Sequence, residues 1–90
     1  MKKLSEIRSE IDLLDSKIAS MLVKRLDLIL SAVDKKDGVE DLRRESEIIT
    51  RLTDGLSEPF KIYIKNIYLN IFTEGKNIML KKRKGYNTDS

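Results

Sequence analysis

The chain has 90 residues, of which 37% are charged and 40% hydrophobic, and it contains no cysteine, histidine or tryptophan. This length suits one small domain, and the lack of cysteine excludes disulfide bonds and thiolate metal sites. The lack of histidine excludes Ser-His-Asp and Cys-His catalysis, and no phosphate-binding loop, dinucleotide-binding glycine pattern or EF-hand loop occurs. We therefore expect no metal and no cofactor.

The first predicted element is a helix over residues 5–34. Its apolar residues recur in alternating steps of three and four, and glycine and proline are absent from residues 1–37. At about 1.5 Å per residue this helix would be roughly 45 Å long, so its apolar face needs a partner along its whole length. The face consists of Leu4, Ile7, Ile11, Leu14, Ile18, Met21, Leu28 and Ala32.

The second predicted element is a short helix that follows a turn at Asp37-Gly38. Asp41 is a suitable N-cap residue for this helix, and Gly55 stands where a glycine commonly ends one. Its apolar face contains Leu42, Ile49 and Leu52.

The third predicted element is a helix that begins near Ser57, its expected cap, with Pro59 in the first turn. It is expected to end after Lys82, and strand patterns are missing from the chain. We therefore predict an all-α fold of long, short and medium helices, with residues 1–82 forming one helical domain. Because three helices of these lengths cannot cover their own apolar faces, two copies are expected to intertwine as a homodimer.

The net charge of +3 is confined to the C-terminal end. Four of the 18 cations and one of the 15 anions lie after Leu80, so residues 1–80 are neutral overall. A solvated helix end, favoured by the helix dipole, explains this cluster, and contact with an acidic partner is the alternative. We expect residues 83–90 to be a disordered basic and polar tail, and we expect no specific binding to nucleic acid.

The sequence also lacks the patterns of membrane proteins and secreted proteins. Nowhere do 18 apolar residues follow one another, so no transmembrane helix is predicted. Two lysines occur near the N-terminus, but no apolar stretch follows them, so no signal peptide is predicted. We therefore expect a cytoplasmic protein without membrane contact.

Three residues break the helical pattern. Arg25 and Glu45 fall on the apolar faces of the first and second helices, where a buried charge is costly unless it is paired. They could pair with each other inside the dimer, or Arg25 could belong to a pocket for an anionic ligand, because arginine binds carboxylates through two parallel hydrogen bonds. Gly75 falls on the apolar face of the third helix, where close helix packing or a ligand would explain it.

The chain resembles the small all-helical (AroQ-type) chorismate mutases in three stretches. They are LSEIRSEIDLLDSKIASMLVKR at 4–25, GVEDLRRESEII at 38–49 and IYLNIFTEGKNIML at 67–80. The resemblance implies an intertwined homodimer with two equivalent sites for the dicarboxylate chorismate. It further implies the rearrangement of chorismate to prephenate, a step of aromatic amino-acid biosynthesis that uses no cofactor.

The resemblance also implies roles for the cationic residues. Arg8 would reach across the dimer to a substrate carboxylate, and Arg25 would be the principal carboxylate ligand within the site. Lys36 would contact a carboxylate and the ether oxygen of chorismate. Lys35 would take that role if the loop, which is shorter than in the family, shifts the register.

Asp41 and Glu45 would lie near the substrate hydroxyl, with Arg44 supporting the carboxylate end. The family usually has a serine and a glutamine or glutamate where this chain has Gly75 and Met79. Neither residue can donate a side-chain hydrogen bond, so the resemblance predicts a weak mutase. A lyase that removes pyruvate from isochorismate and a non-catalytic helical dimer that binds a metabolite or a protein remain as alternatives.

Overall fold

The computed structural model describes residues 1–33 and 42–84, and this part of the chain is all helical, without strands. The helices are α1 (Leu4–Val33), α2 (Leu42–Thr53) and α3 (Phe60–Arg83). The predicted all-α fold and the order long, short, medium are confirmed, and α1 is offset by one residue from its predicted range. None of these helices combines the length and hydrophobicity needed to cross a membrane.

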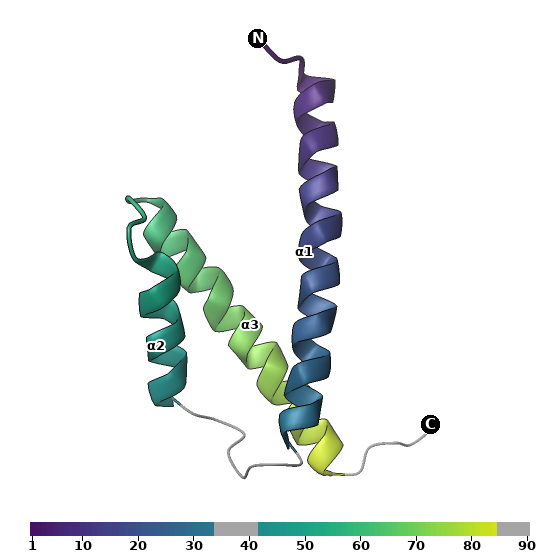
Figure 1. Ribbon diagram of the computed structural model, residues 1–90, viewed down its shortest axis with the longest axis vertical. Helices are drawn as coiled ribbons and strands as arrows, with labels where there is room; N and C mark the ends of the chain where they lie inside the picture. The colour runs from purple at the N-terminus through teal and green to yellow at the C-terminus, as the bar shows by residue number, and fades with distance from the viewer. Residues whose placement is uncertain (34–41, 85–90) are drawn as a thin grey trace.

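Helix α3 is the central helix, and the other two helices pack against it. Figure 1 shows α2 beside the N-terminal part of α3, while the C-terminal part of α3 crosses the C-terminal end of α1. In the described chain α1 and α2 each pack on α3 and not on each other. The radius of gyration is 16.6 Å, against roughly 12 Å expected for a compact domain of this length. The chain is therefore extended, and the N-terminal half of α1 projects beyond the other helices (Figure 1).

Helix α2 ends near Gly55, as the sequence predicted. Gly55 has a φ of 82°, a left-handed conformation that glycine adopts without the steric cost of a Cβ. The amide of Leu56 donates a hydrogen bond of 3.0 Å to the carbonyl of Thr53, the last residue of α2. Gly55 therefore turns the chain from α2 toward α3.

The predicted cap of α3 is wrong. Pro59, and not Ser57, is the N-cap residue, and no side chain caps the helix. Ser57 contributes its backbone instead, because its carbonyl accepts a 3.1 Å hydrogen bond from the amide of Lys61. Ser57 precedes the N-cap by two residues, so the helix begins later than the turn residues indicated.

The C-terminal end of α1 is joined to α3 by a side chain. The last turn of α1 contains no basic residue to interact with its free carbonyl groups. Lys82 of α3 supplies the positive charge, because its Nζ donates a 2.9 Å hydrogen bond to the carbonyl of Leu30. A cation at a helix C-terminus also interacts favourably with the helix dipole. The crossing of α1 and α3 is therefore stabilised by a polar contact as well as by packing.

The buried core is small. Its hydrophobic residues are Val33, Ile48 and Phe72, one from each helix, and no large side chain of the described chain is fully buried. By contrast, the apolar face of the N-terminal half of α1 is 42% to 62% exposed and is not covered by another described element. We call this surface the α1 face; it consists of Leu4, Ile7, Ile11, Leu14, Ile18 and Met21.

Candidate functional site

Arg25 lies where the C-terminal half of α1 meets the middle of α3. Its guanidinium carbon is 5.6 Å from the ring centroid of Phe72 and 6.0 Å from that of Tyr68. The two rings pack edge to face, with centroids 5.7 Å apart. A guanidinium within about 6 Å of an aromatic face is attracted by the ring quadrupole. Two adjacent turns of α3 therefore supply an aromatic support for the half-buried Arg25 side chain.

Gly75 lies beside Arg25 and allows α1 to approach α3. A Cβ atom at this position would lie 3.2 Å from Cδ1 of Ile29 and 3.9 Å from a terminal nitrogen of Arg25. The first distance is tighter than ordinary van der Waals contact, so a side chain here would displace Ile29. Gly75 is buried, and close helix packing accounts for the glycine.

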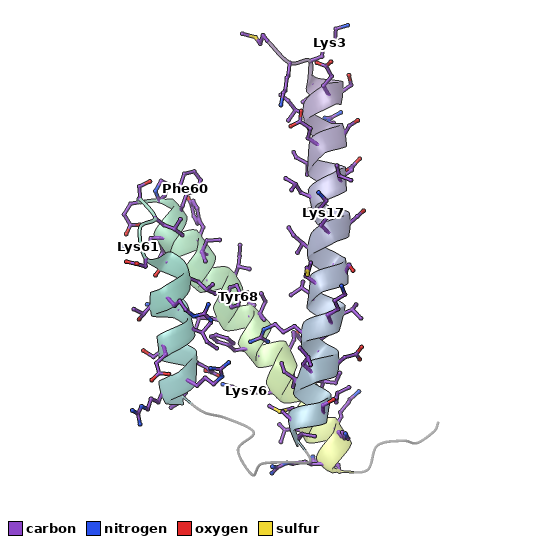
Figure 2. The ribbon with its side chains drawn as sticks, viewed as in Figure 1. Lys3, Lys17, Phe60, Lys61, Tyr68 and Lys76 are labelled. Atoms are coloured by element: carbon purple, nitrogen blue, oxygen red, sulfur yellow. The ribbon has the colours of Figure 1, made fainter. Side chains whose placement is uncertain are left out.

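Glu45 is paired with a residue that the sequence analysis did not single out. Its two carboxylate oxygens lie 3.2 Å and 3.4 Å from Nζ of Lys76, and the side chains are only 19% and 24% exposed. Figure 2 shows Lys76 in the space between α2 and α3. Arg25 and Glu45 therefore do not pair within the described part of a single chain, because α2 packs on α3 and not on α1, and their pairing inside a dimer stays a prediction.

Arg25 consequently has no carboxylate partner among residues 1–33 and 42–84. Its contacts with polar or aromatic groups there are those with Tyr68 and Phe72. A half-buried cation is stabilised by aromatic faces less than by an anion, and a guanidinium is well suited to bind a carboxylate. The arrangement can therefore accept an anionic group next to α3.

The other predicted site residues differ in burial and in their place in the fold. Met79 is half-buried on α3, one turn beyond Gly75, whereas Arg44 is exposed on α2. Arg8 is exposed near the start of α1 and lies 17 positions before Arg25, a separation of roughly 25 Å along the helix. A single chain therefore does not bring Arg8 to Arg25. Lys35, Lys36 and Asp41 lie outside the described residues.

Sequence reasoning missed the contributions of Tyr68, Phe72 and Lys76. None of the three was given a role in the predicted site. Their spacing was the available signal, because residues four apart lie on one side of a helix. Phe72 and Lys76 therefore had to lie together, one turn apart, next to Gly75.

An open groove also follows the C-terminal half of α3. Its volume is about 630 Å³, and it is lined by Leu26 of α1 and by α3 residues between Glu74 and Lys84. None of the predicted site residues lines this groove. The residues that the structure describes also contain no cluster of three acidic, histidine or cysteine side chains that could hold a metal ion.

Comparison with known proteins adds no relative. No protein-family model, no curated protein sequence and no solved structure matches the chain. The resemblance to the all-helical chorismate mutases therefore receives no support from these comparisons and remains a hypothesis that rests on individual residues.

Proposed function

We propose that this chain is a homodimeric chorismate mutase of low activity, in which Arg25 binds a carboxylate of chorismate. The observation that carries the proposal is the environment of Arg25, which is half-buried against two aromatic rings without a carboxylate partner in the described chain. A partly buried cation left without an anion is costly, and a bound dianion would offset that cost. The charge of the site supports an anionic ligand, and the resemblance supports chorismate.

A second copy of the chain is the proposed cover of the α1 face. Burying one half-exposed aliphatic side chain stabilises by about 1 kcal/mol, so the six residues of this face would contribute roughly 6 kcal/mol per chain. A two-fold dimer brings the same residues of both copies together, and a continuous apolar stripe is complementary to itself. The length of α1, at 30 residues, allows it to extend past its own α3 onto a partner.

The position of Arg8 also supports a dimeric site. Arg8 and Arg25 are roughly 25 Å apart along one straight helix, so they cannot grip one small ligand from the same chain. In a dimer of α1 helices that run in opposite directions, the Arg8 end of one copy approaches the Arg25 end of the other. The two carboxylates of chorismate would then be bound by arginines of different chains.

The proposed reaction suits a site without histidine or cysteine. It breaks a C–O bond and forms a C–C bond within one molecule, so it requires neither a nucleophile nor proton transfer. The site would hold the compact conformer of chorismate and stabilise the negative charge that develops on the ether oxygen. Arg25 would serve the first task, and Lys36, by resemblance, would serve the second.

Low activity is proposed because two expected donors are missing. Gly75 and Met79 occupy the positions where the family offers side chains that hydrogen-bond the substrate. Removal of one preorganised donor of this kind typically costs about 3 kcal/mol, or roughly 100- to 1000-fold in rate. A side chain at position 75 would in addition require Ile29 to shift, because its Cβ would lie 3.2 Å from Cδ1 of Ile29.

The test follows the loss of chorismate absorbance in the presence of the purified full-length chain. We expect acceleration over buffer at high protein concentration, and we expect Arg25→Ala to remove it while the dimer persists in sedimentation. Lys24→Ala is the matched control, because it removes a cation from the adjacent, exposed position of α1. Absence of any acceleration by the unmodified chain would reject the enzymatic proposal.

A non-catalytic dimer that binds a dicarboxylate is the second candidate. The packing of Gly75 against Ile29 and the thioether of Met79 favour it, because both leave the α3 side of the site without a donor for the ether oxygen. Saturable binding of chorismate without conversion would identify this function. Release of free pyruvate from isochorismate would instead identify the lyase.

A further inference from the structure

Lys76 and Arg25 lie at the same turn of α3, one pairing with a residue of α2 and the other projecting from α1. Arg25 reaches this turn from α1, where it lies against Phe72 and next to Gly75. Lys76 follows Gly75 in the chain and stands one turn beyond Phe72, and its Nζ is directed toward α2 (Figure 2). The two cations therefore border one short stretch of helix, residues 72–76.

Glu45 is the carboxylate that α2 brings to this stretch. It is held by Lys76 at 3.2 Å and 3.4 Å in a partly buried position, where salt screens an ion pair less than at an exposed surface. Glu74 lies in the same turn of α3 but is exposed and accepts a hydrogen bond from Asn77. Glu45 is therefore the acidic group that could compete with a ligand for Arg25.

We propose that Lys76 is a positioning residue, which holds Glu45 on the α2 side of α3 and thereby keeps Arg25 available to a dianion. The inference rests on the proposed dicarboxylate site. Without Lys76, the half-buried Glu45 carboxylate loses its cation, and Arg25 is the next cation bordering this stretch of α3. Glu45 would then neutralise Arg25 and repel an anionic ligand. Lys76 therefore determines the preference of the site for dianionic ligands.

The test uses calorimetric titration of the full-length dimer with prephenate, the dianionic product, which is not consumed. Lys76→Gln should weaken prephenate binding about tenfold, the order expected for one additional charge interaction at a partly buried site. Lys76→Arg should retain binding, because arginine preserves the cation. Lys65→Gln, which alters an exposed lysine of the same helix, should bind prephenate as the unmodified chain does.

A second titration separates positioning from other roles. Phenylpyruvate, which lacks one carboxylate of prephenate, should be affected by Lys76→Gln less than prephenate, because a monoanion gains less from the site charge. The double variant Glu45→Gln with Lys76→Gln should bind prephenate within about threefold of Glu45→Gln alone, because without a carboxylate at position 45 the loss of Lys76 leaves nothing to occupy Arg25. Glutamine at position 45 can still accept a hydrogen bond from the ligand.

Each result has a definite meaning. Unchanged prephenate binding by a folded Lys76→Gln dimer would overturn the inference and leave the proposed function standing. Binding by the double variant about tenfold weaker than by Glu45→Gln alone would also overturn it, because Lys76 would then act directly on the ligand. Failure of the unmodified chain to bind prephenate or chorismate would overturn the proposed function and this inference together.

Discussion

The two halves of α1 share one helical pattern and differ in what covers them. In the C-terminal half, Arg25, Ile29 and Val33 are partly or fully buried, and α3 packs against this part of the helix. In the N-terminal half, the α1 face is 42% to 62% exposed with no described element against it. The difference leaves one half of a uniform apolar stripe packed within the chain and the other half exposed, and we propose that a second copy of the chain covers the exposed half. The half that folds within the chain contains Arg25, and the exposed half contains Arg8, which the proposed site takes from the other copy.

The largest expected effect concerns the half of α1 without a partner. Leu14→Asp places a charge in the middle of the α1 face and should raise the dimer dissociation constant more than about 100-fold, because a carboxylate cannot be buried unpaired. Sedimentation equilibrium measures the change. Ser16→Asp adds the same charge on the opposite side of α1 and should leave the dimer intact. A Leu14→Asp chain that dimerises normally would show that the α1 face is not the interface.

The next largest effect concerns the hydrogen-bond donors that are missing at Gly75 and Met79. Met79→Gln should raise kcat for chorismate about tenfold, because an amide one turn beyond Gly75 could donate a hydrogen bond to the developing charge on the ether oxygen. Leu80→Gln, at the neighbouring exposed position, should leave kcat unchanged. A rate that falls or stays constant in Met79→Gln, while the dimer persists, would mean that α3 presents a different side to the substrate.

A smaller effect is expected at the aromatic support of Arg25. Tyr68→Leu keeps an apolar side chain but removes one ring face, and we expect roughly fivefold weaker binding of prephenate, corresponding to about 1 kcal/mol. Tyr63→Leu removes an exposed tyrosine of the same helix and is the control. Equal affinities for the two variants would show that the ring of Tyr68 does not orient Arg25.

An effect of similar size is expected at the contact between α1 and α3 at Gly75. Gly75→Ser places a Cβ 3.2 Å from Cδ1 of Ile29, and Ile29→Val removes that methyl group. The substitution at Gly75 should therefore be more favourable in the valine background, by about 1 kcal/mol in a double-mutant cycle. Thermal unfolding of the four proteins measures this coupling. A coupling energy of zero would mean that Ile29 moves aside without cost.

The helices could be predicted from the sequence more completely than the contacts between them. The apolar period located all three helices and Gly55 marked the end of the second, because these signals are local, whereas Pro59 is the N-cap of α3 and not part of its first turn as predicted. The Ser57 cap failed since the start of α3 depends on the geometry of the whole connection and not on one favourable residue. Local signals thus determine which residues are helical, and less securely where a helix begins.

The site was predictable only in part for a related reason. Arg25 and Gly75 could be identified because each breaks the pattern of its own helix, and the structure brings them together. Which cation would pair with Glu45 could not be foreseen, because that depends on α2 packing against α3 and not against α1. The spacing of Lys76 from Phe72 places the two residues on one side of the helix, but only the packing of α2 on α3 shows that Lys76 pairs with Glu45.

The most direct test of the central claim is calorimetric titration of prephenate into the unmodified dimer and into its Arg25→Ala variant. We predict saturable binding of one prephenate per chain in the unmodified protein, and no detectable binding in a variant that remains folded and dimeric. Equal binding by both proteins, or the absence of binding by the unmodified protein, would contradict the claim that Arg25 is held ready for a small dianion.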